Sequence, residues 1–248
     1  MIKLTQNDIY DIETSFLMIS PLKMKDSIKG TQKDFGCGCL YEPQKSKRYL
    51  LSVRHLNVAN MILGVLGKYD AHLKQPLYYT SPFNFFEQFR ISQNGFIEPL
   101  GKDIDFIWRK VDPSEEYIYT TFADNDQSSV VPAGEMKSFT SIVEPLLDDD
   151  YMFGGPVECG FDFERKAITG ERVYYSCEYL TEEDNYYFSF QIDDEVEQSQ
   201  LKGLSGTPIF NRRHELVSLV VGGYEKGNVI KGINLWKLLQ LIKLIEEV

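Results

Sequence analysis

The chain has 248 residues, of which 26 are basic and 37 acidic, and its formal net charge is −11. This charge argues against nucleic acid and anionic membrane surfaces as partners. The shares of hydrophobic residues (43%) and charged residues (25%) are those of a globular protein and exclude a disordered or fibrous class. The length suits one large domain or two domains of about 120 residues.

No targeting segment or metal motif stands out in the sequence. The first 19 residues have neither a basic start nor a long apolar run, so we expect no secretory signal. No window reaches the roughly 18 apolar residues of a membrane span. The four cysteines, including Cys37 and Cys39, lack the spacing of a zinc site, and the acidic run at 148–150 lacks features of a calcium loop. We expect free thiols, a cytoplasmic location and no metal or cofactor.

Most of the periodic signal is strand-like. Short runs of β-branched and aromatic residues, separated by Gly, Pro, Asn and Asp, predict strands. These lie at residues 16–19, 36–41, 49–53, 104–111, 117–122, 173–179, 186–192, 207–210, 216–221 and 229–233. Many short strands without alternating helices indicate an antiparallel barrel or sandwich.

Two segments complete the predicted organisation. The polar stretch 114–144, with Pro132-Ala133-Gly134, is predicted to link two halves. Apolar residues at helical spacing follow Asn234, a candidate N-cap. They predict a C-terminal helix from about residue 234 that packs its apolar stripe on a barrel.

The clearest chemical motif is Gly203-Leu204-Ser205-Gly206-Thr207-Pro208. Flanking glycines can turn backbone N–H groups toward one point, and a nucleophilic serine needs both a base and such donors for its oxyanion. The same pattern also suits an ordinary turn before a strand. The nucleophile elbow of α/β-hydrolases is excluded, because Thr207 replaces its second glycine and only His214, in a polar turn, follows the serine.

A histidine and two acids precede this serine. His55 ends a predicted strand, whereas His72 fits the usual structural or solvent-facing role of a lone histidine. Asp103 and Asp105 follow on a later strand. They are two residues apart and therefore point to the same face, so alternation does not choose between them.

Taken in chain order, these motifs resemble the trypsin/chymotrypsin-like serine protease family. The matching segments are residues 36–41, 50–55, 105–108, 203–208 and 215–223, and the resemblance covers roughly residues 15–248. It implies an all-β fold of two six-stranded antiparallel β-barrels with the active site between them. The barrels are expected at residues 12–122 and 135–232, and the C-terminal helix at 234–248.

The resemblance also implies a mechanism. Ser205 attacks a peptide carbonyl, His55 takes and returns the proton, and the N–H groups of Gly203 and Ser205 hold the oxyanion. Asp105 is expected to orient His55, because this register keeps the apolar run of the family. Asp103 in that role would bury Asp105 where a small apolar residue belongs.

Further positions follow from the same resemblance. The expected substrate-binding residues are Ser199, at the base of a pocket for an uncharged side chain, and Val221, Gly222 and Gly223. Leu204 replaces the aspartate that pairs with a new N-terminus in secreted members, so we expect no activation cleavage. The expected partners are a protein or peptide substrate and a possible regulatory protein, with no nucleic acid or membrane.

Two other functions stay open from the sequence. A protease fold that has lost turnover could serve as a binding or sensor module. A third possibility is an esterase that acts on small acyl esters. A protease has an activated serine, and a binding or sensor module that has lost turnover does not.

Overall fold

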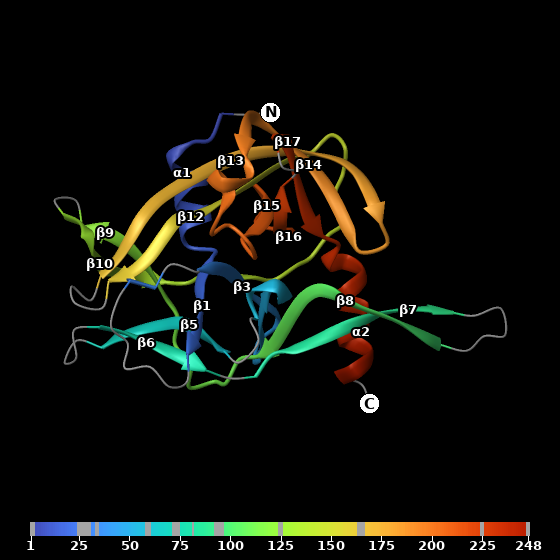
Figure 1. Cartoon of the computed structure of the whole chain (residues 1–248), viewed down its shortest axis with the longest axis horizontal. Coiled ribbons are helices and arrows are strands. Elements are labelled where there is room, and N and C mark those ends of the chain that lie inside the picture. Colours follow the sequence, from blue (N-terminus) through green and yellow to red (C-terminus); the bar gives the residue numbers. More distant parts are fainter. Residues whose placement is uncertain are drawn as a thin grey trace.

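The computed structural model describes residues 3–23, 31–32, 35–57, 61–70, 75–80, 82–91, 97–123, 126–162, 167–223 and 226–246. Two β-rich halves lie one above the other, with helix α1 (Gln6–Glu13) near the N-terminus and helix α2 (Leu235–Glu246) at the C-terminal end (Figure 1). None of the helices in these ranges is long and apolar enough to cross a membrane.

The first half is an open, curved sheet, whose seven antiparallel strands run in the order β6-β5-β1-β3-β4-β8-β7. The strands are β1 (Leu17–Lys23), β3 (Gly36–Gln44), β4 (Lys47–Ser52), β5 (Met61–Asp70), β6 (Gln75–Thr80), β7 (Asn84–Ile91) and β8 (Ile97–Lys110). The short strand β11 (Ser138–Phe139) adds to β3 in parallel. This half therefore forms a half-barrel.

The second half is a closed barrel of six antiparallel strands. Its order is β13-β14-β17-β16-β15-β12, and β12 pairs again with β13 to close the ring. The strands are β12 (Asp150–Asp162), β13 (Ala167–Asp184), β14 (Tyr187–Glu197), β15 (Pro208–Asn211), β16 (Leu216–Gly223) and β17 (Lys226–Ile233). The short strand β2 (Thr31–Gln32) attaches to β12.

The predicted fold class, two antiparallel barrels with a C-terminal helix, is confirmed, but the first half is an open half-barrel of seven strands and not a six-stranded barrel as expected. All ten predicted strands are present, and α2 begins next to Asn234, whose Oδ1 accepts a hydrogen bond from the backbone N–H of Lys237 at 3.2 Å. The sequence did not predict α1, β2, β5, β6, β7, β10 (Asp126–Glu135), β11 or β12. The exact division of the halves stays a prediction, because β2 and β11 each pair with the sheet of the other half.

The segment predicted as a linker contains a hairpin, so that prediction was incomplete. Strands β9 (Ile118–Ala123) and β10 (Asp126–Glu135) pair as a separate two-stranded sheet. The register shifts between Pro132 and Gly134. A proline is tolerated at such a bulge in a strand that has a free edge, so this Pro-Ala-Gly sequence marks an irregular strand here.

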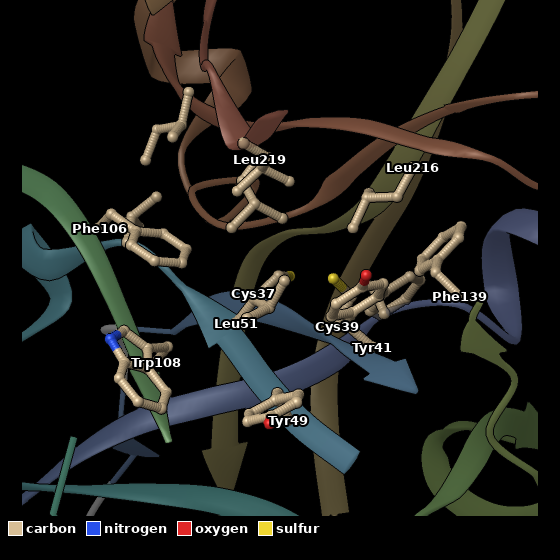
Figure 2. Packing of buried hydrophobic residues seen from close by; sticks show 14 of the residues in the cluster. Cys37, Cys39, Tyr41, Tyr49, Leu51, Phe106, Trp108, Phe139, Leu216 and Leu219 are labelled. Carbon is tan, nitrogen blue, oxygen red and sulfur yellow. The ribbon is translucent and has the colours of Figure 1, made fainter. Parts of the chain in front are cut away.

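A continuous apolar core joins the two halves. Figure 2 shows Leu51, Phe106 and Trp108 of the half-barrel facing Leu216 and Leu219 of the closed barrel. Helix α2 adds its buried stripe to this same cluster, through Leu235, Leu238, Leu239 and Ile242. The helix thus packs at the junction of the halves. Burial of apolar area, at about 25 cal/mol per Å², favours a fixed arrangement of both.

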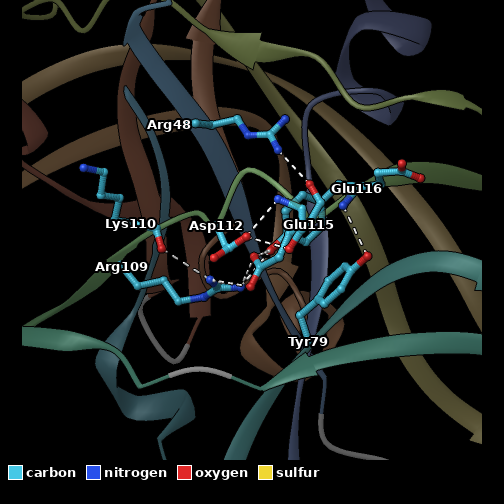
Figure 3. A network of polar contacts seen from close by, with 9 residues as sticks. Arg48, Tyr79, Arg109, Lys110, Asp112, Glu115 and Glu116 are labelled. Carbon is cyan, nitrogen blue, oxygen red and sulfur yellow. Dashed lines mark hydrogen bonds and ion pairs between the residues drawn. The ribbon is translucent and has the colours of Figure 1, made fainter. Parts of the chain in front are cut away.

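A buried polar network anchors the end of β8, the strand that carries Asp105. The guanidinium of Arg109 donates to both carboxylate oxygens of Glu115, at 3.0 and 2.7 Å, and to the hydroxyl of Tyr117 at 2.7 Å. Arg48 donates to the backbone carbonyl of Glu115 at 2.8 Å (Figure 3). A two-pronged contact between buried charges fixes geometry better than a single hydrogen bond does.

Candidate active site

His55 lies in a short 3-10 helix, η1 (Arg54–Leu56), directly after β4. Its ring Nδ1 is 2.7 Å from Oδ2 of Asp105, and its backbone N–H donates to Oδ1 of the same carboxylate at 2.8 Å. One carboxylate therefore fixes both the ring and the backbone of His55. With Nδ1 engaged in this way, Nε2 is the ring nitrogen available to accept a proton. The His55 side chain is 42% exposed and accessible to a substrate.

The structure joins Asp105 to His55 and places Asp103 elsewhere. The carboxylate of Asp103 pairs with Nη2 of Arg54 at 2.6 Å. The guanidinium of Arg54 also stacks over the ring of Phe85, 3.8 Å from its centroid. The two acids thus lie beside neighbouring residues of η1, and only one of them reaches the histidine.

The loop that carries Ser205, residues 202–207 before β15 and here called the serine loop, depends on two glycines. Gly203 has a φ of 110° and Gly206 a φ of 85°, backbone conformations that other residues rarely adopt. A Cβ atom on Gly203 would lie 2.5 Å from the carbonyl oxygen of Pro156, and one on Gly206 would lie 1.9 Å from that of Cys37. Both positions therefore require glycine for conformational and steric reasons.

Replacing Gly206 with alanine should distort this loop. We expect the free energy of unfolding to fall by about 3 kcal/mol, since the change adds both a positive-φ penalty and a contact with backbone. Gly222→Ala is the matched control, because a Cβ there meets nothing within 4 Å. Urea unfolding of the two variants checks this, and equal stabilities would contradict the described packing of the loop.

Both halves hold the serine loop in place. The backbone N–H of Cys37, on β3, donates to the carbonyl of Ser205 at 2.6 Å, and the hydroxyl of Ser52 donates to the carbonyl of Cys37 at 2.6 Å. From the closed barrel, the carbonyl of Val220 accepts from the N–H of Gly206 at 2.7 Å. His55 follows Ser52 by three residues, which span at most about 11 Å. The serine loop and His55 therefore lie in one neighbourhood.

No hydrogen bond joins the hydroxyl of Ser205 to His55 in the part of the chain that the structure describes. Such contacts are often long in a site without substrate and shorten when substrate binds. Of these two contacts, the structure shows only that of His55 with Asp105.

Two backbone N–H groups beside Ser205 are unused. Among the described residues, the N–H groups of Gly203 and Ser205 donate to no other group of the chain, whereas that of Leu204, between them, donates to the carbonyl of Leu201 at 3.0 Å. Ser205 itself is half-buried. Unused backbone donors are rare in folded proteins. A pair of them next to a serine is the arrangement that stabilises an oxyanion.

The side chain of Leu204 is fully buried in the core of the closed barrel. Apolar packing therefore anchors the serine loop at the position where a secreted protease uses an ion pair with its new N-terminus. Helix α1 makes contacts away from this loop. Asp8 of α1 pairs with Arg212 at 3.0 Å, and Ile12 is buried in the core between the halves.

Removing residues 1–13 should destabilise the protein without raising any hydrolytic activity. The deletion exposes the apolar surface that Ile12 covers and breaks the contact between Asp8 and Arg212, so we expect a loss of about 3 kcal/mol or more. Urea unfolding measures the loss, and hydrolysis of a casein-type substrate measures activity. If the 248-residue chain is inert and gains turnover on truncation, activation cleavage is required.

One edge of β16 is open where the substrate was predicted to bind. Strand β15 pairs with β16 only as far as Leu219, so among the described residues no strand pairs with that edge at Val221, Gly222 and Gly223. Ser199 belongs to the 3-10 helix η2 (Gln198–Leu201), next to β16, but its side chain lies outside the described part. An unpaired edge can accept an extended peptide as an added strand.

Of the other two histidines, the structure describes His214. His72 lies outside the described residues. His214 lies in the turn between β15 and β16, as predicted, with its ring stacked on Phe139 at a centroid distance of 4.4 Å. Burial lowers the pKa of His214. Burial thus favours the uncharged ring, which is half-buried against Phe139 and Phe210.

This lowered pKa predicts a pH effect on stability. The His214 ring binds a proton more readily in the unfolded chain than in the folded one. Its contribution to the free energy of unfolding is therefore fully present above the ordinary histidine pKa of about 6.5 and is lost as the pH falls below that value. In His214→Asn, which tolerates the positive φ, we expect a smaller loss of unfolding free energy between pH 7.5 and 5.5. Urea unfolding at both pH values tests this, and identical losses in variant and wild type would contradict it.

Three contacts of the site were not foreseen from the sequence. They are the hydrogen bonds of Cys37 with the serine loop, that of Ser52 with the carbonyl of Cys37, and that of Tyr187, whose hydroxyl lies 3.4 Å from the backbone nitrogen of Asp105. Ser52 and Cys37 do lie inside recognised motifs, but Tyr187 belongs to no motif. Cys37, Cys39 and Cys177 are free thiols, and no group of metal-ligating side chains occurs among the described residues.

Comparison with known proteins supports the fold. No protein-family model matches the chain, and no curated protein matches it in sequence. Among solved structures, the chain is similar to a serine endoprotease from Yersinia pestis, with a TM-score of 0.50 and 12% identity. The match covers 98% of this chain and 67% of that one. The chain thus has the fold of a chymotrypsin-like protease.

Proposed function

We propose that the protein is a serine endopeptidase that hydrolyses peptide bonds through Ser205, His55 and Asp105. The two-point contact of the Asp105 carboxylate with His55 carries this proposal. A carboxylate that binds both Nδ1 and the backbone N–H of one histidine fixes the ring in a single orientation. That is the role of the acid in a catalytic triad.

The proposed reaction begins with attack by the oxygen of Ser205 on the carbonyl carbon of a peptide bond. Nε2 of His55 takes the serine proton as the bond forms, and the N–H groups of Gly203 and Ser205 stabilise the carbonyl oxygen as it becomes negative. The intermediate then collapses. The C–N bond breaks, His55 donates the proton to the leaving amine, and an acyl-enzyme remains on Ser205.

Water completes the cycle by the same groups. His55 takes a proton from a water molecule, which attacks the acyl carbon, and the second intermediate expels Ser205 with return of that proton. The substrate main chain is proposed to lie along the open edge of β16 at Val221, Gly222 and Gly223. Pairing to a strand edge recognises main chain and suits a protein or peptide substrate.

The unused N–H groups favour a turnover enzyme over a protease-fold binding or sensor module, since a module without catalysis does not need an oxyanion site. Paired assays with a casein-type substrate and a nitrophenyl ester test the proposal, with Ser205→Ala as the control in both. We expect wild type to hydrolyse casein. Hydrolysis of the ester alone would indicate an esterase, and activity on neither substrate would favour the binding module.

We further propose where the enzyme acts and how it is controlled. Three buried thiols without disulfides are consistent with a reducing compartment, and we propose a cytoplasmic enzyme on that ground. A protease there needs narrow specificity or a controlled active state, which a regulatory protein partner could provide.

A further inference from the structure

The thiol of Cys37 contacts the serine loop in addition to its backbone. Its Sγ donates to the carbonyl of Gly203 at 3.4 Å, while its N–H donates to the carbonyl of Ser205. Cys37 is fully buried and belongs to the half-barrel, whereas the loop belongs to the closed barrel. Cys37 of the half-barrel thus donates to two carbonyl groups of the serine loop, those of Gly203 and Ser205.

The contact with Gly203 matters because glycine has the freest backbone of any residue. The carbonyl of Gly203 belongs to the peptide unit that precedes Leu204. The N–H of Gly203 is one of the two unused donors. A hydrogen bond to that carbonyl limits rotation about the Gly203 backbone. Catalytic donors lose much of their effect when they are not held in place before the reaction.

We propose that the Cys37 thiol is a positioning residue for the oxyanion site. It acts through Gly203 and touches neither the substrate nor the reacting atoms. The inference rests on the proposed function and adds a chemical role for a side chain outside the triad. The thiol is a weak donor, so its removal should reduce the rate far less than loss of a triad residue.

The test compares Cys37→Ala and Cys37→Ser with Cys39→Ala. Serine at position 37 keeps a donor, and alanine removes it. Cys39 is a matched control, because it lies two residues along β3, is equally buried and belongs to the same apolar cluster. Each alanine variant removes one sulfur atom from the same apolar cluster. Each variant is assayed for peptide hydrolysis and for its rate of labelling by a fluorophosphonate probe.

For Cys37→Ala we expect kcat and the labelling rate to fall about tenfold, with KM changed by less than twofold. Cys37→Ser should keep both rates within about threefold of wild type, and Cys39→Ala should match wild type. Equal rates in Cys37→Ala and wild type, or equal losses in both alanine variants, would refute the positioning role. If Cys37→Ala does not fold, loss of rate in a folded Cys37→Ser beyond about thirtyfold would also refute it. A wild-type chain that does not label refutes the proposed function itself.

Discussion

Replacing Ser205 with alanine should lower the rate of peptide hydrolysis by about 10⁶-fold, the effect found when a triad member is removed from a serine protease. The physical reason is that alanine removes the proposed nucleophilic oxygen from the loop that carries the N–H groups of Gly203 and Ser205. Those donors remain in the variant, so a small residual rate over water is expected. Initial rates on a fluorogenic peptide measure the effect.

Two comparisons make this result specific. His55→Ala should cost a similar factor, and the double variant should be no worse than either single one, since the residues act as a unit. His214→Asn should change the rate by less than about tenfold, because His214 packs away from the site. Retention of more than about 1% of the activity in Ser205→Ala would refute the nucleophile assignment.

Asp105→Asn should lower kcat by about 10⁴-fold while leaving the fold intact. The amide can still accept the backbone N–H of His55 through its oxygen, but its nitrogen would donate to Nδ1 of the ring. That exchange places the ring proton on Nε2, where the serine proton has to go. The histidine is then in the wrong tautomer to act as a base.

Asp103→Asn is the matched control on the same strand. Its carboxylate pairs with Arg54, and both side chains are partly exposed, so the pair contributes little energy. We expect less than a tenfold change in kcat. A large loss at Asp103 together with a small loss at Asp105 would reverse the assignment of the acid.

The fold was largely predictable because its strands alternate or form apolar runs between turn residues. The missed strand β12 shows the limit of that pattern. It contains Gly154, Gly155 and Pro156, which are typical of turns, yet these residues lie where β13 and the serine loop pack closely. A Cβ on Gly155 would lie 3.2 Å from Leu204. Close tertiary packing, which local pattern does not encode, decides such a segment.

The candidate site was predictable to the extent that its residues lie in motifs. His55, the two aspartates and Ser205 are all visible in the sequence, and register favoured Asp105, the acid that contacts His55. The contacts of Cys37 and Tyr187 were not predictable, because they join residues 166 and 82 positions apart in the chain. Only the packing of the two halves brings such residues together.

Labelling of the intact wild-type chain with a fluorophosphonate, followed by mass spectrometry, tests the proposed activity most directly. The probe forms a covalent bond only with a serine that is activated by a base and an oxyanion site. We predict a single adduct on Ser205, absent from Ser205→Ala and formed far more slowly by His55→Ala. An unlabelled wild-type chain, or an adduct at another residue, would contradict the proposal.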